Sequence, residues 1–226
     1  CLQESEKQVS GAYGPRIHTP EGKGGLNLLE ALKDRKGIKE EFLHAFRGIR
    51  REGSAALLEW LEGTDFFTAP ASTRFHGAYE GGLAEHSVHV YRRLNRLLDA
   101  EYGDACPYST ETAAICGLLH DVCKVEYYTV STRNVKNEKT GQWEKQPFYT
   151  VNDRLPYGHG EKSVYILSGF MKLTREEAMA VRWHMGGFDE AVKGGARCLP
   201  EVFGRYPLAL LLHLADMQAA CLDEAG

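Results

Sequence analysis

The sequence predicts a mostly α-helical protein with one inserted β-hairpin. Apolar residues recur at helical spacing over residues 26–63, 83–98 and 160–222, whereas residues 126–151 are rich in Tyr, Thr and Val on either side of a turn. The chain has 226 residues, of which 43% are hydrophobic and 26% are charged, and this is enough to bury one substantial core. We therefore expect a single helical domain over residues 26–226.

The chain before the predicted helix that carries His86 divides into three segments of different composition. Residues 1–25 are rich in Gly and Pro with few apolar side chains, so burial does not offset the entropy of ordering them, and we expect a flexible tail. Residues 26–63 hold three apolar groups separated by glycine or charge, which indicates short packing helices. Residues 64–82 are aromatic and turn-rich, as expected of a loop that forms one wall of a pocket.

The next two predicted helices carry polar residues that face inward. The apolar stripe over residues 83–98 directs His86 toward the core, with His89 on the same side. The helix that follows takes Ser109 or Thr110 as its N-cap, and its small residues permit close helix contact. It ends at adjacent His120 and Asp121, with Lys124 one turn further on.

The hairpin and the later helices complete the fold. Residues 137–141 (NEKTG) form the predicted turn, and Pro147 restricts the return strand to an edge or a bulge. Thr174 and Glu177 have the spacing of a capping box, which starts a helix with His184 on its inner side. Residues 208–222 are apolar on nearly every side, and this predicts a central helix.

Composition excludes several functions. A net charge of -4 gives no extended surface for nucleic acid, and no apolar run is long enough to span a membrane. Six cysteines are scattered without a C-x-x-C pair, which is typical of reduced thiols and predicts a cytoplasmic location. A homo-oligomer is compatible with the sequence.

Asp216 lies within the most apolar helix and therefore needs a cationic partner. A buried salt bridge and a metal ion are both adequate explanations for a single aspartate. However, His86 and the His120–Asp121 pair require the same kind of partner. Nitrogen and oxygen donors without thiolate favour Mn, Fe, Co, Ni or Zn and are compatible with Mg.

The ordered set His86, His120–Asp121 and Asp216 resembles the HD superfamily of metal-dependent phosphohydrolases over roughly residues 76–222. Residues 76–86 (HGAYEGGLAEH) look like the entry to the first metal helix in HD domains of some exoribonucleases. Lys124 stands where the superfamily often has a lysine near the substrate phosphate, although Cys123 replaces a common glycine. The resemblance implies an HD-type helical bundle and hydrolysis of a phosphoester.

His159 and His184 fall in order between these motifs, as do the extra ligands of two-metal HD enzymes. They predict a second ion bridged by Asp121, so that the chain holds one or two ions. The alternative is that His159 caps a helix and that His184 is a core or substrate-contacting residue.

The expected substrate is a small phosphorylated molecule such as a nucleotide. Metal-activated water would be positioned by Asp121, and Lys124 would contact the phosphoryl oxygens as a catalytic and binding group. His76, His89 and Tyr79 are further candidates for substrate binding, and aromatic residues of the loop and hairpin, including Tyr127, Tyr128 and Trp143, offer stacking surfaces. Two alternatives are a di-iron oxygenase on the same ligands and a regulatory module that binds nucleotide without turnover.

Overall fold

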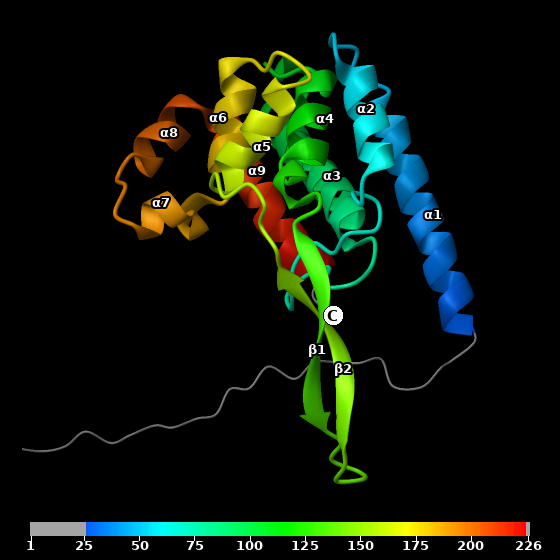
Figure 1. Ribbon diagram of the computed structural model, residues 1–226. Coiled ribbons are helices and arrows are strands. Elements are labelled where there is room, and N and C mark those ends of the chain that lie inside the picture. Colours follow the sequence, from blue (N-terminus) through cyan, green and yellow to red (C-terminus); the bar gives the residue numbers. More distant parts are fainter. Residues whose placement is uncertain (1–25, 225–226) are drawn as a thin grey trace, which may run out of the picture.

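The computed structural model describes residues 26–224, and their helices pack side by side with one long hairpin projecting from them (Figure 1). The predicted tail, residues 1–25, lies outside the described residues. The helices before the hairpin are α1 (Leu26–Phe46), α2 (Ser54–Gly63), α3 (Gly82–Tyr102) and α4 (Thr110–Leu119), with 3-10 turns η1 (Gly103–Ala105) and η2 (Val122–Lys124). Those after it are α5 (His159–Ser168), α6 (Arg175–Trp183), α7 (Glu190–Lys193), α8 (Leu199–Arg205) and α9 (Pro207–Gln218), with η3 (Gly186–Phe188) and the π-helix η4 (Ala219–Asp223). The predicted fold class is confirmed.

The centre of the bundle is formed by α3, α4, α5, α6 and α9, with α1 and α2 on one flank (Figure 1). Two glycines let these helices approach closely. A methyl group on Gly117 of α4 would lie 2.6 Å from the Cα atom of Tyr91 in α3. One on Gly160 of α5 would lie 2.1 Å from the carbonyl oxygen of Arg182 in α6. The predicted close contact of the small-residue helix is therefore present.

Capping sets where two of these helices begin. The hydroxyl of Ser109 accepts a hydrogen bond from the amide of Thr112, so Ser109 is the N-cap of α4. Thr174 and Glu177 form the predicted capping box of α6. The Glu177 carboxylate is fully buried and receives two bonds from Arg51, at 2.5 and 3.0 Å. This ion pair ties the turn before α2 to the start of α6.

The prediction of short helices over residues 26–46 was wrong. Residues 26–46 form one long helix, α1, which continues through the exposed Gly37. A glycine inside a helix lowers its stability by only about 1 kcal/mol relative to alanine, so Gly37 does not end the helix. The last helix, α9, lies at the centre of the bundle as predicted, although one side of it is exposed. Leu210 and Leu214 are exposed, since α3, α6 and α8 cover only part of α9.

The hairpin consists of β1 (Tyr128–Lys136) and β2 (Trp143–Val151), paired antiparallel with Tyr128 opposite Val151 and Lys136 opposite Trp143. Pro147 fits because a two-stranded sheet has only edge strands. Trp143 is exposed and begins β2 opposite Lys136, beside the turn. Figure 1 shows that the turn end of the hairpin is remote from the helices, so the predicted stacking surface does not include Trp143. None of the described helices is both long and apolar enough for a membrane span.

Candidate metal centre

His120 and Asp121 lie where α4 ends, and both are buried. The small residues of α4 bring this end against α3, and the helix ends at Leu119 so that His120 becomes its C-cap. The Nδ1 atom of His120 lies 3.0 Å from the carbonyl oxygen of Gly117. Because a carbonyl only accepts, Nδ1 carries the proton and Nε2 faces the centre with its lone pair.

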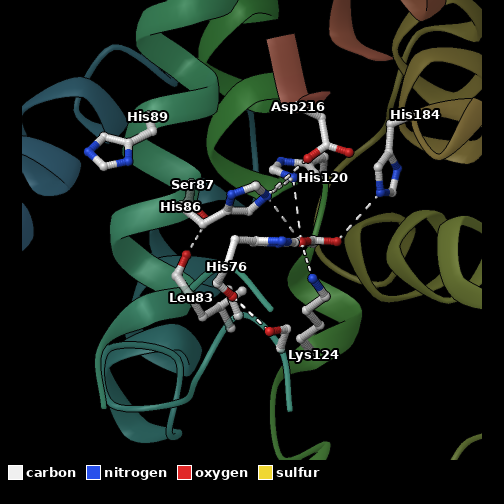
Figure 2. Close-up of polar contacts among 12 residues, drawn as sticks. His76, Leu83, His86, Ser87, His89, His120, Lys124, His184 and Asp216 are labelled. Atoms are coloured by element: carbon white, nitrogen blue, oxygen red, sulfur yellow. Dashed lines mark hydrogen bonds and ion pairs between the residues drawn. The ribbon is translucent and has the colours of Figure 1, made fainter. Parts of the chain in front are cut away.

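A first group of donors surrounds the Nε2 atom of His86. It lies 3.1 Å from Oδ1 of Asp216, 3.4 Å from Nε2 of His120 and 3.6 Å from Oδ2 of Asp121. In Figure 2, the side chains of His86, His120 and Asp216 point toward one another from three helices. These are the four residues predicted for the first ion, and the structure brings them together.

A second group uses the other oxygen of Asp121. The Nε2 atom of His159 lies 2.8 Å from Oδ1 of Asp121, and that of His184 lies 3.5 Å from the same oxygen. His184 donates its Nδ1 proton to the carbonyl oxygen of Val181, at 2.7 Å. Its buried Nε2 atom accepts no hydrogen bond from any residue in the range 26–224. An unpartnered buried lone pair beside a carboxylate is what a metal ligand requires, so these residues fit an ion.

The arrangement agrees with a family comparison. A model described as HD domain matches residues 83–225, which is more than half of the chain. The chain belongs to the HD domain family. HD domains generally act as metal-dependent hydrolases and bind divalent metals. No curated protein and no solved structure matches the chain.

The charges of the HD centre are strongly coupled. Burial lowers the pKa of His120 to about 3, which keeps it neutral. Burial also opposes the charged form of His86 and His159, but neighbouring acceptors raise both pKa values to about 10. The acceptors are Asp216 and Glu224 for His86, and Cys123 and Asp121 for His159. A divalent cation would replace these two protons, so metal binding would release protons.

Lys124 lies beside Asp121, its Nζ atom 2.6 Å from Oδ2. Burial alone would raise the pKa of Asp121, but the charges of Lys124 and the nearby histidines hold it well below its usual value. Burial likewise opposes the charge of Lys124, and Asp121 raises its pKa above the ordinary value. The two residues therefore form a buried ion pair at the centre.

The other residues predicted to bind substrate contact His86, Glu224 or Glu85. The ring of His76 packs against that of His86, with centroids 4.8 Å apart. His89 points away from the centre in Figure 2, and its Nδ1 atom lies 3.1 Å from Oε1 of Glu224. Tyr79 is half-exposed and donates its hydroxyl to Glu85. Their roles toward substrate stay predictions.

Two neighbours of the centre were missed by the sequence analysis as partners of its histidines. Glu224 contacts His86, and the sulfur of Cys123 lies 3.4 Å from Nδ1 of His159. Glu224 follows η4 and lies 138 positions from His86 in the chain, so no local pattern connects the two. Cys123 was noted only as a departure from a common glycine.

A cavity of about 370 Å³ opens beside the centre. Its wall includes Lys124 and His159 from the centre, Tyr127 from the base of the hairpin, and Phe188 from η3. The remaining lining residues are Cys123, Asp153, Pro156, Gly158, Lys162, Met185, Asp189, Glu190 and Lys193. Of the aromatic residues predicted to offer stacking surfaces on the hairpin, Tyr127 therefore lies in the wall of the cavity.

Proposed function

We propose that this HD domain is a metal-dependent phosphohydrolase that cleaves a phosphoester of a nucleotide or a related small phosphorylated molecule. One observation carries the proposal. The two oxygens of Asp121 are shared between two groups of imidazoles, at 2.8 to 3.6 Å, with the ammonium of Lys124 alongside. Such a centre combines ligands for two cations with a fixed positive charge for a phosphoryl group.

The ligands divide between the two groups. His86, His120, Asp121 and Asp216 would hold one ion, and Asp121, His159 and His184 would hold a second. Divalent ions bound there would supply hydroxide near neutral pH and neutralise charge on the phosphoryl oxygens. Asp121 lies between the two groups, which suits it to orient the attacking water.

Lys124 contributes through its charge. Its side chain is almost completely buried and its raised pKa keeps it protonated, so it can donate to a non-bridging phosphoryl oxygen at any ordinary pH. A preorganised donor of this kind typically contributes a factor of about 10² to 10³ to kcat. Its ion pair with Asp121 holds it in place before substrate arrives.

The cavity supports a small substrate. A volume of about 370 Å³ lies at the lower end of the range of roughly 300–1,000 Å³ for small-molecule pockets. Tyr127 and Phe188 supply apolar surface for a base or sugar, while Lys124 and His159 connect the cavity to the metal centre. A nucleotide would place its phosphate at Lys124 and its base or sugar against Tyr127 and Phe188.

The test is metal analysis followed by phosphate release from a panel of nucleotides with Mn, Co, Ni and Mg. We expect turnover by wild type, loss of about 10²-fold or more in kcat for Lys124→Ala, and no change for Lys39→Ala at an exposed site. Iron with oxygen uptake and no phosphate release would favour the oxygenase instead. Nucleotide binding without turnover in any metal would indicate a regulatory module.

A further inference from the structure

Glu224 contacts the Nδ1 atom of His86, the ring nitrogen that does not face the metal centre. Its side chain is only 2% exposed. Its Oε1 and Oε2 atoms lie 3.0 and 3.1 Å from Nδ1 of His86, and Oε1 lies 3.1 Å from Nδ1 of His89. A carboxylate is rarely buried without such partners, and here both partners belong to α3.

The segment that carries Glu224 is anchored independently. The π-helix η4 follows α9 directly, and the amide of Glu224 donates to the carbonyl oxygen of Ala219 at 3.1 Å. The neighbouring Asp223 forms a two-point ion pair with Arg93 of α3. The backbone at Glu224 is therefore held against α3 by contacts that do not involve His86.

The contact decides which nitrogen of His86 is available. An ionised carboxylate only accepts hydrogen bonds, so Nδ1 of His86 must carry a proton. In a neutral imidazole, Nε2 then holds the lone pair, and Nε2 is the atom that faces Asp216, Asp121 and His120. A carboxylate on the outer nitrogen also increases the basicity of the inner one.

We propose that Glu224 is a positioning residue that holds His86 in the Nδ1–H tautomer and thereby strengthens the first metal site. The inference rests on the metal centre of the proposed function and is independent of the substrate. His89 contacts the same carboxylate oxygen, and its role is therefore to hold the carboxylate of Glu224 in position.

A different assignment of the same atoms is a separate cation site made by His76, His86 and Glu224, whose donor atoms lie within 4.8 Å of one another. His86 would then have to bind one ion through each nitrogen, which requires a fully deprotonated ring. The 3.0 Å contact between Nδ1 and the carboxylate is an ordinary charge-assisted hydrogen bond and needs no such ring. The geometry therefore favours positioning.

The experiment compares Glu224→Ala, Glu224→Gln and Asp99→Asn, the last as a control at an exposed carboxylate of α3. Metal affinity is measured by competition with a chelator, and nitrogen chemical shifts of the histidine rings are measured in the Zn-loaded protein. We expect Glu224→Ala to weaken the first site by about 10- to 100-fold and Glu224→Gln to have a smaller effect, because an amide oxygen still accepts from Nδ1. Asp99→Asn should keep wild-type affinity, and His86 of wild type should show a protonated Nδ1.

The outcomes separate the hypotheses. Equal affinities for Glu224→Ala and Asp99→Asn, or a His86 ring protonated at Nε2, would overturn the positioning role while leaving the proposed function intact. Loss of a third ion on mutation of Glu224, with the other two unchanged, would overturn it in favour of a separate cation site. A wild type that binds no divalent metal would overturn both this inference and the proposed function.

Discussion

The contact between α5 and α6 can be tested by adding a single methyl group. In Gly160→Ala the new carbon would lie 2.1 Å from the carbonyl oxygen of Arg182, whereas ordinary contacts begin at 3.4 Å, a deficit of about 1.3 Å. The obstacle is backbone, so α5 has to move. Forcing extra volume into a well-packed contact typically costs about 1 to 3 kcal/mol of unfolding free energy.

The same displacement reaches the metal centre, because Gly160 follows His159 directly. Metal–nitrogen bonds are about 2.0 to 2.1 Å long with little tolerance. A shift of about an ångström removes His159 from coordination and leaves the His86 group intact. We therefore expect Gly160→Ala to hold one ion per chain where wild type holds two.

The assay is urea unfolding together with metal content per chain. Gly37→Ala is the matched control, because Gly37 lies exposed inside α1 with no atom within 4 Å of the added carbon. That variant should gain up to about 1 kcal/mol from helix propensity and keep both ions. A Gly160→Ala protein with control-like stability and two ions would refute the packing argument.

Three further predictions concern the centre, an ion pair and the hairpin. Asp121→Asn should lose both ions and all turnover, with Asp99→Asn on the surface of α3 as the control in the metal and rate assays. Arg51→Met leaves the buried carboxylate of Glu177 unpaired and should cost about 3 to 5 kcal/mol in urea unfolding at neutral pH. Burial alone would raise the pKa of Glu177, but the hydrogen bond from Arg51 lowers it overall. The ion pair therefore stabilises the folded protein at pH values above the pKa of Glu177 in the unfolded chain, and this stabilisation is lost as the pH falls through the pKa of Glu177 in the folded protein. Wild-type stability should therefore fall more than that of the variant on acidification, and parallel curves would contradict this. Replacing residues 127–151 by a short turn should raise KM, because this removes Tyr127 from the wall of the cavity. Trimming only residues 132–147, which keeps Tyr127 and the paired base of the hairpin, should leave KM unchanged, and metal content should stay constant in both variants.

The donors of the centre could be selected from the sequence because of their chemistry. Asp216 is a carboxylate in an apolar helix, and His86 and His120 lie at positions that face inward, so each needs a partner before any three-dimensional arrangement is known. In the structure, these three side chains converge on one site. The hairpin was equally visible, since alternation and a turn signal are local properties.

Other features depend on tertiary contacts that no local pattern encodes. Glu224 lies outside any apolar periodicity, and only the π-helix before it brings its carboxylate to His86. The direction of the hairpin, which carries Trp143 away from the cavity, is not contained in strand alternation. The glycine between the first two apolar groups, Gly37, was interpreted as a break between helices, because the low helix propensity of glycine is visible in the sequence. The packing of α1 that offsets this low propensity is not visible there.

The projecting hairpin has a consequence for behaviour in concentrated solution. Each of its strands has an outer edge that pairs with no other strand within residues 26–224, and such edges recruit strands of other molecules into cross-β aggregates. β2 interrupts its own edge with Pro147, which has no amide proton, and with the charges of Glu144 and Lys145. We expect these residues to act as gatekeepers, and their replacement by Val or Thr to make the hairpin more prone to nucleate fibrils.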